Sequence, residues 1–504
     1  MPPPPNPTPA VTPDLESPHA QDSLRIAQGM TSMLASQVVQ MPISFVLNAV
    51  LARRLGPQDF GVFFFGQTVT GMGFHFVDWG QNSTIAAEVA RDRSRTEALL
   101  GTSIVLKLLL GVLATGALLA LGLVQGYSAL ELKVMIFLAS VALVEEIKNS
   151  GTAILRGWEM PVQVNAVGFA GFIAWSLPAI VLILAGFGLR GVLCAAMASS
   201  LVPLVLAAVL VRRCKVRLPR FSRALVRPLL GRGSAFLAFI LVLALQPYID
   251  TAFLARLAPA EVMGWHAATR RIVGLLILPA VSVTYAMYPT LARLHHEAPQ
   301  RAIDLMRGAL RKLVLLGVPA AVGAVLFARP VVHVIYGSVR YDGVILNLQV
   351  FSLFIFLVYF SMVIGTSLLA ADRVKTWTGV QALCLVVSAV GDAPLIGFFQ
   401  GRLGNGALGV SVSNIISEVL MVAIGAALLP RQMLGGRLLQ SAMQSFAGGV
   451  AMVGAALALR QLPAPIAAVA SLAAYVSVLF LLGALKGEDV RTLIGVIRAR
   501  AALR

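Results

Sequence analysis

Apolar residues along the chain gather in runs about as long as a membrane is thick. A helix of roughly 20 apolar residues crosses a hydrocarbon core of about 30 Å. The runs are continuous, whereas the strands of a transmembrane barrel alternate in short segments. The pattern predicts fourteen transmembrane helices, near residues 24–52, 60–80, 99–124, 129–147, 163–186, 189–211, 234–254, 264–291, 311–328, 344–371, 375–398, 406–429, 438–459 and 463–485.

The composition supports an all-α polytopic membrane protein. Of the 504 residues, 58% are hydrophobic and 12% are charged, whereas a soluble domain has about 25% charged residues. The net charge of +18 comes from basic residues in short segments between the apolar runs. This distribution is typical of membrane topology rather than of a nucleic-acid groove, and no nucleic-acid partner is expected.

The basic residues also predict the orientation of the chain. With the N-terminus in the cytoplasm, 28 Lys and Arg residues fall on the cytoplasmic side and 8 on the opposite side. Cytoplasmic loops carry the excess of Lys and Arg, so both termini are expected in the cytoplasm. The Pro-rich first 22 residues are typical of a disordered tail rather than a signal peptide.

The order of the runs suggests two bundles and an additional pair of helices. The segment 212–233 contains eight Lys and Arg residues and is predicted to be a cytoplasmic linker. It could anchor the chain at the anionic inner leaflet, or it could be a docking site for a cytoplasmic enzyme. The predicted organisation is a tail (1–22), a six-helix N-terminal bundle (23–211), the linker (212–233), a six-helix C-terminal bundle (234–430), and two extra helices with a basic cytoplasmic tail (431–504).

Two predicted hairpins are similar to each other. "LARRLGPQDFG" ends at Gly61, and "LARLAPAEVMG" ends at Gly264. In this alignment Pro57 matches Pro259. Six runs separate the hairpins, so both have the same orientation, and they predict a parallel repeat of two pseudo-symmetric bundles. The alternative is chance, because short turns reuse Gly, Pro and acidic residues.

Charged residues lie inside the second hairpin. Asp250 and Arg270 are expected at similar depth on neighbouring helices, where an unpaired charge costs about 2.5 kcal/mol or more. We therefore expect Asp250 to pair with Arg270 or Arg271, or to share a hydrated cavity with them. The matching residues of the first hairpin are polar but uncharged, Asn48 and Gln67.

These motifs resemble those of Wzx/PST-type polysaccharide flippases of the multidrug/oligosaccharidyl-lipid/polysaccharide (MOP) exporter superfamily. The similarity lies in "LARRLGPQDFGVFFFGQTV", "VDWGQNSTIAAEVARDRS", "PYIDTAFLARLAPAEVMGWHAATRRIVGLLILPAVSVTYAMYPTLARL", "VPAAVGAVLFARPVVHVIYG" and "LLAADRVKT". It covers roughly residues 24–430. Each motif is short, and their order and spacing carry the resemblance.

The resemblance implies two bundles around a central cavity and a transporter rather than an enzyme. The implied activity is the flipping of an undecaprenyl-diphosphate oligosaccharide across the bacterial inner membrane for surface polysaccharide synthesis, by alternating access. The partners it implies are this cargo, membrane lipids, a polysaccharide polymerase and glycosyltransferases. A lipid II flippase or a cation-coupled small-molecule antiporter of the same superfamily is the alternative.

Basic residues are the candidates for binding a diphosphate. Arg270 and Arg271 lead, because a guanidinium offers several donors and stays charged; the alternative is pairing with Asp250 alone. Lys107 could meet the diphosphate near the inner side or extend to the membrane surface. Arg53, at the outer rim, could contact cargo or anchor the chain.

Two acids inside the runs are candidates for ion coupling. Asp392 or Glu418 could carry a coupling proton or Na⁺, since an acid within the membrane is a functional candidate by default, or it could form a structural hydrogen bond. The sequence lacks a Walker A loop and the motifs H-E-x-x-H and G-x-S-x-G. No catalytic residue, metal site or organic cofactor is therefore expected.

Overall fold

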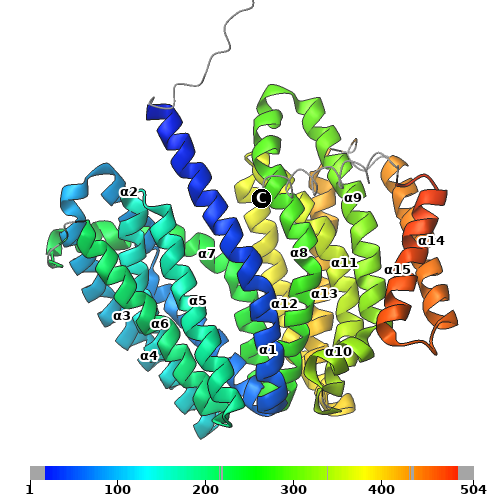
Figure 1. Ribbon diagram of the computed structural model, residues 1–504, viewed down its shortest axis with the longest axis horizontal. Coiled ribbons are helices and arrows are strands. Elements are labelled where there is room, and N and C mark those ends of the chain that lie inside the picture. Colours follow the sequence, from blue (N-terminus) through cyan, green and yellow to red (C-terminus); the bar gives the residue numbers. More distant parts are fainter. Residues whose placement is uncertain are drawn as a thin grey trace, which may run out of the picture. The chain divides into compact units, whose positions relative to one another are not determined.

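The computed structural model describes residues 18–214, 216, 219–337, 339–430, 432 and 436–485. These residues form fifteen α-helices and two short 3-10 turns, and no strand. The helices are α1 (Pro18–Asp78), α2 (Gln81–Arg91), α3 (Thr96–Gln125), α4 (Ala129–Gly157), α5 (Pro161–Leu184), α6 (Gly188–Arg213), α7 (Arg223–Leu257), α8 (Ala260–Glu297), α9 (Pro299–Leu326), α10 (Ala328–Tyr336), α11 (Asp342–Ala370), α12 (Val374–Leu403), α13 (Ala407–Leu428), α14 (Gly436–Ala458) and α15 (Ala464–Leu481), as Figure 1 shows.

The first two predicted spans lie within α1. The helix is interrupted at Gly56, whose φ of 75° and ψ of 169° are not helical. Glycine has no Cβ, so it adopts this conformation without the steric penalty of other residues. The predicted hairpin that ends at Gly61 is therefore present as two helical segments joined by a kink at Gly56.

The other predicted spans each correspond to one helix, and the polytopic all-α fold is confirmed. Eleven helices of the described chain are long and apolar enough to cross a membrane, with α1 and α2 treated together. The helices α4, α7 and α10 fall outside that set. The short helices α2 and α10 were not predicted. The helix α7 begins at Arg223, within the predicted linker, because a helix can continue beyond the apolar residues that mark the membrane.

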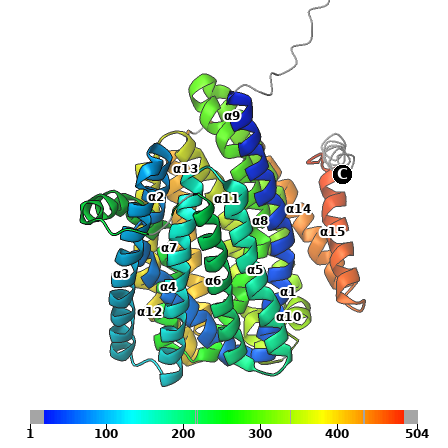
Figure 2. The same ribbon diagram turned by 60° about the vertical axis from the view of Figure 1, so that its left-hand side comes forward.

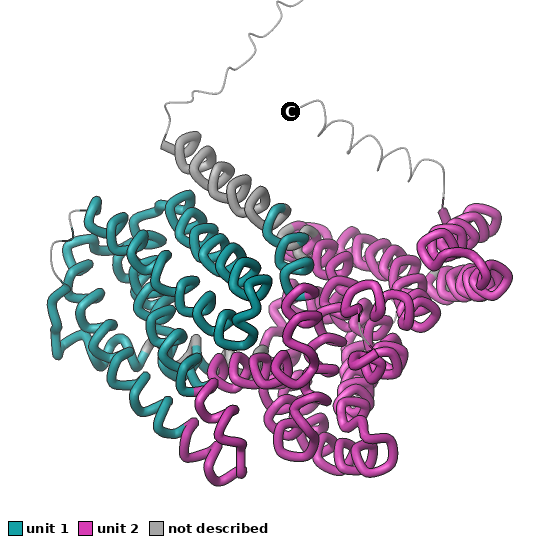
Figure 3. Tube along the Cα trace, turned by 60° about the horizontal axis from the view of Figure 1, so that its bottom comes forward, with its two compact units in different colours: residues 1–48, 73–117, 136–237 teal, residues 49–72, 118–135, 238–504 magenta. Residues whose placement is uncertain are grey.

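The described chain divides into two compact units, coloured separately in Figure 3. They differ from the two halves of the sequence, because residues 49–72 and 118–135 join the C-terminal half. The bundle boundaries given above stay a prediction. Unit 1 comprises Met1–Asn48, Gly73–Ala117 and Ile136–Leu237, and unit 2 comprises Ala49–Met72, Leu118–Met135 and Ala238–Arg504.

Each unit has its own apolar core. In unit 1, Ile85, Leu99 and Ile154 are buried together, and α5 packs beside α6 (Figure 2). In unit 2, a large cluster on α8, α9 and α11 includes Tyr359. The extra pair α14 and α15 packs on α9, where the Tyr475 hydroxyl donates a hydrogen bond of 2.8 Å to the Leu315 carbonyl.

Candidate functional site

A polar cluster lies among apolar helices inside unit 2. Asp250 of α7 is fully buried and accepts a hydrogen bond of 2.9 Å from the Asn414 side chain of α13. The Gln246 amide, one turn before Asp250, donates to the Asn414 side-chain oxygen. The cluster extends to α12, because the Ser388 hydroxyl of α12 lies 3.3 Å from the Ser413 hydroxyl of α13. Three helices therefore bring polar groups to one buried place.

The cluster contains carboxylate oxygens without hydrogen-bond donors. Asp392 of α12 is fully buried, and its carboxyl is close enough to that of Asp250 for the two charges to interact. Neither oxygen of Asp392 has a hydrogen-bond partner among the described residues, and neither does Oδ1 of Asp250. Buried polar atoms are normally paired, so these three acceptors can take a proton or a cation.

Arg270 of α8 provides the positive charge of the cluster. Its Nη1 lies 3.7 Å from Oδ2 of Asp250, so the predicted pairing is confirmed. The Arg270 side chain remains 31% exposed, while that of Asp250 is fully buried. The guanidinium can thus neutralise the Asp250 carboxylate and still donate hydrogen bonds from its exposed part to another group. Arg271 is exposed and does not join the pair.

Glu418, the second candidate for ion coupling, has a different environment. It lies one turn beyond Asn414 on α13 and is buried. Its Oε1 accepts a hydrogen bond from the Ser361 hydroxyl of α11. Among the two candidate acids, Asp392 is the one with both carboxylate oxygens unpaired.

Lys107 lies in a separate charged cluster, inside unit 1. Its side chain is fully buried, so the alternative that it extends to the membrane surface is wrong. Its Nζ lies 2.7 Å from Oε2 of Glu146 and 3.4 Å from Oδ1 of Asp78, and it donates to the Asn82 side chain at 2.9 Å. The ammonium group is thus fully occupied by protein acceptors. Its role in binding cargo stays a prediction.

The two similar hairpins pack against each other within unit 2. A Cβ on Gly61 would clash with the Ala260 carbonyl oxygen, and one on Gly264 would clash with the Pro57 carbonyl oxygen. The aligned glycines therefore allow the two backbones to touch. Arg53 reaches the end of α10, where its Nε donates to the Ile335 carbonyl at 2.6 Å and its Nη2 to the Val334 carbonyl. A cation at a helix C-terminus is favourable.

The polar residues of the first hairpin do not join the buried cluster. The Asn48 side chain donates to the Ser44 carbonyl of its own helix at 2.7 Å. Gln67 is exposed. Their role in binding cargo stays a prediction.

Sequence reasoning missed Gln246, Ser388 and Asn414. Each lies four residues before an acid of α7, α12 or α13, and residues four apart share one helix face. The spacing of four between a polar residue and an acid within an apolar run could have identified these residues. It does not indicate which helices are neighbours, so the hydrogen bonds between helices could be identified only in the structure.

A family described as "Polysaccharide biosynthesis protein" matches residues 26–295. This match covers more than half of the chain. The chain belongs to this family of polysaccharide biosynthesis proteins. The resemblance identified from the sequence motifs is thus confirmed. A comparison with curated proteins found no match.

Solved structures of a flippase and of transporters have a fold similar to that of this polysaccharide biosynthesis protein. The lipid II flippase MurJ, in an inward closed conformation, aligns with a TM-score of 0.71 at 12% identity, over 91% of this chain and 99% of its own. An inward-facing MATE family multidrug resistance transporter aligns with a TM-score of 0.62 at 18% identity, over 77% of this chain and 94% of its own. A MOP superfamily transporter from Pyrococcus furiosus aligns with a TM-score of 0.50 at 19% identity, over 80% and 94%. At these identities the similarity concerns the fold.

Proposed function

We propose that this polysaccharide biosynthesis protein flips a lipid-linked oligosaccharide across the bacterial inner membrane. The observation that carries the proposal is the family match over residues 26–295. The cargo would be an undecaprenyl-diphosphate repeat unit, made on the cytoplasmic side and used outside by a polymerase. Both chain termini would lie in the cytoplasm, as the distribution of Lys and Arg predicts.

The buried cluster of unit 2 supports coupling of this transport to a cation. The carboxyls of Asp250 and Asp392 lie close together, the Arg270 guanidinium pairs with Asp250, and three of the carboxyl oxygens lack donors. A buried excess of negative charge is costly unless it is neutralised. Na⁺ prefers oxygen ligands of the kind present here, as hard cations do, and a proton would neutralise the same charge. Asp250, Asp392 and Asn414 would hold the ion.

Arg270 would connect the ion to the cargo. Its partly exposed guanidinium could bind a phosphate when a cation takes over the neutralisation of Asp250. Arginine suits diphosphates because its fork of donors matches the phosphate oxygens. Arg271 and Lys107 remain secondary candidates for cargo contacts.

A lipid II flippase is the second candidate. The similarity to MurJ extends over 91% of this chain, which favours a polyprenyl-diphosphate saccharide in either case. The two candidates differ in the sugar attached to the lipid.

Reconstitution tests the proposal and separates the two candidates. Purified protein in liposomes would receive a labelled undecaprenyl-diphosphate oligosaccharide or lipid II in one leaflet, and a membrane-impermeant enzyme would report arrival in the other. We expect transport of the oligosaccharide, and its loss in Arg270→Gln. Transport of lipid II alone would favour the second candidate, and transport of neither would refute both.

A further inference from the structure

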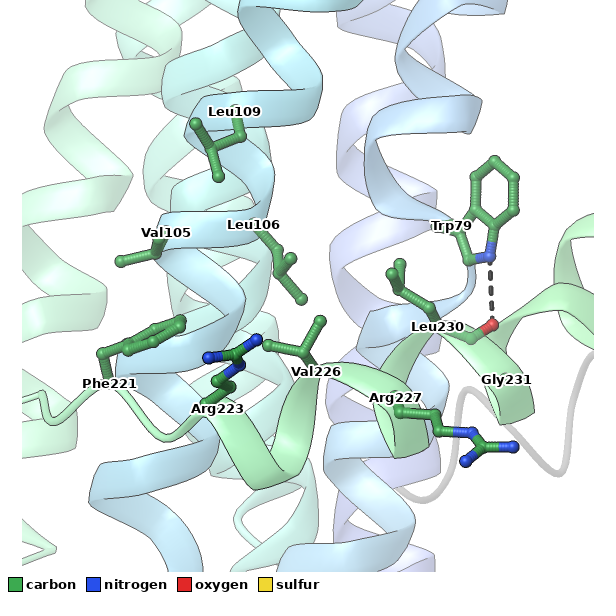
Figure 4. A pocket seen from close by; sticks show the side chains of 10 residues that line it. All are labelled: Trp79, Val105, Leu106, Leu109, Phe221, Arg223, Val226, Arg227, Leu230 and Gly231. Atoms are coloured by element: carbon green, nitrogen blue, oxygen red, sulfur yellow. Dashed lines mark hydrogen bonds between the residues drawn. The ribbon is translucent and has the colours of Figure 1, made fainter.

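An apolar groove lies on unit 1 beside the first turns of α7. Its volume is about 810 Å³, within the usual range for small-ligand sites. One wall is α3, with Val105, Leu106 and Leu109, and the other comprises Phe221 and the face of α7 that carries Val226 and Leu230 (Figure 4). Leu109 is 60% exposed and Phe221 is 56% exposed. Such exposed apolar surface requires a lipid or another apolar partner.

The groove is held open by contacts at both ends of the segment that forms its second wall. At one end, the Ser222 amide donates to the Thr102 hydroxyl at 3.0 Å, and the Arg220 amide donates to the Glu97 carbonyl at 3.0 Å. Gly101 permits this approach, because a Cβ there would lie 2.5 Å from the Arg220 backbone. The segment therefore runs against α3 without filling the space beside it.

At the other end, Trp79 fixes α7 to the end of α1. Its indole donates a hydrogen bond of 3.0 Å to the Leu230 carbonyl. Its backbone φ is +47°, a left-handed conformation that is uncommon for a bulky residue. Strained backbone persists where surrounding contacts enforce it. The groove is thus a preformed feature of unit 1.

Basic side chains at the groove determine the chemistry of its occupant. Arg223 lies between Phe221 and Val226, and Arg227 follows one turn later near Gly231 (Figure 4). Neither guanidinium forms an ion pair with a described side chain, and no acid is among the lining residues. The groove thus combines an apolar cleft with two cations, on the side that the Lys and Arg distribution predicts to be cytoplasmic.

We propose that this groove binds one phospholipid with an anionic headgroup from the inner leaflet. An acyl chain lies along Val105, Leu109 and Leu230, and the headgroup phosphate meets Arg223, with Arg227 beside it. The depth fits, because Val105 and Leu109 lie roughly two to four turns inside α3 from its N-terminus, towards the membrane interior. Basic residues at a membrane surface attract anionic lipids.

The bound lipid would stabilise the base of α7. This helix begins in unit 1 and continues into unit 2 after Leu237. A lipid that bridges α3 and the first turns of α7 adds contacts where the chain passes from one unit to the other. The composition of the inner leaflet would therefore affect the stability of this connection, independently of the cargo.

Native mass spectrometry of the full-length protein in detergent tests the proposal. The protein would be titrated with phosphatidylglycerol or phosphatidylcholine of the same acyl chains. We expect one tightly bound phosphatidylglycerol, with an affinity preference over phosphatidylcholine of roughly fivefold for each arginine at the headgroup, because only phosphatidylglycerol has a net negative charge. Arg223→Gln should reduce the preference most, and the double variant with Arg227→Gln should abolish it.

Controls separate this groove from general attraction to a basic surface. Arg213→Gln removes an exposed charge at the end of α6 that does not line the groove, and should leave the preference intact. Leu109→Trp fills the groove and should weaken both lipids. An unchanged preference in the double variant would overturn the proposal, as would equal affinity for both lipids. Displacement by inorganic phosphate would indicate a free-anion site, and stronger binding of undecaprenyl phosphate would indicate a cargo site; either result would also overturn it.

Discussion

The charged clusters of the two units contain the same kinds of charge and differ in how these are satisfied. In unit 1, Lys107 faces Asp78 and Glu146; in unit 2, Arg270 faces Asp250, whose carboxyl interacts with that of Asp392. Each cluster has two carboxyls and one cation.

The acids of unit 1 have further partners. Asp78 Oδ1 accepts from the Asn82 backbone N–H at 3.2 Å, and Glu146 Oε1 accepts from the Asn149 side chain at 3.2 Å. The acids of unit 2 leave three oxygens without donors. The number of charges alone therefore does not distinguish a structural cluster from a binding site. The number of unoccupied acceptors does.

Removal of the central cation in unit 1 should have the largest effect. Lys107→Met leaves two nearly buried carboxyls without their shared partner, and breaking a buried ion pair costs about 3–5 kcal/mol. Unfolding in detergent, followed by circular dichroism, should show this loss. The second substitution Glu146→Gln should recover part of it. A loss below 1 kcal/mol would show that the cluster is not a structural one.

Asp392→Asn should separate ion binding from folding in unit 2. The variant keeps the shape of the side chain and removes the excess charge, so stability should be retained. Stabilisation by Na⁺ relative to choline should weaken on the order of 10- to 100-fold in apparent affinity, since even outer partners of a metal site contribute this much. Thermal unfolding over a Na⁺ titration measures the change.

Glu418→Gln is the matched control, because Glu418 is buried but already accepts from Ser361. It should keep the Na⁺ response. The reverse result, with the response lost in Glu418→Gln alone, would move the coupling site to Glu418.

The pair Asp250 and Arg270 can be tested by a double-mutant cycle. Asp250→Asn and Arg270→Gln should each lower stability, and the double variant should lose less than their sum. Contacting residues show coupling energies of about 0.5–3 kcal/mol. A coupling near zero would mean that the 3.7 Å separation contributes nothing and that Arg270 serves another partner.

The smallest effect is expected from a charge pair that is open to solvent. Arg293 pairs with Glu297, and their side chains are 64% and 60% exposed. Solvent-exposed pairs contribute about 0.2–1 kcal/mol, so Arg293→Met should change the unfolding free energy within that range. A loss as large as that of Lys107→Met would show that burial does not determine the difference between the pairs.

Hydropathy predicted the spans because it reports which residues can face lipid. It could not predict α2 and α10, since both are short, or the extension of α7 to Arg223. The pairing of Asp250 with Arg270 was predictable, because the helices that carry them are joined by one tight turn. The partners of Lys107 were not, since Asp78 and Glu146 are 29 and 39 residues away from it and meet it only through packing.

The contact between the two hairpins has a consequence for how the sequence can change over time. A side chain at Gly61 would meet the backbone of the second hairpin, and one at Gly264 would meet that of the first. Neither position can accept a larger residue unless the backbone of the other hairpin moves away. The two similar segments therefore cannot change independently, because the backbone of each hairpin requires a glycine in the other.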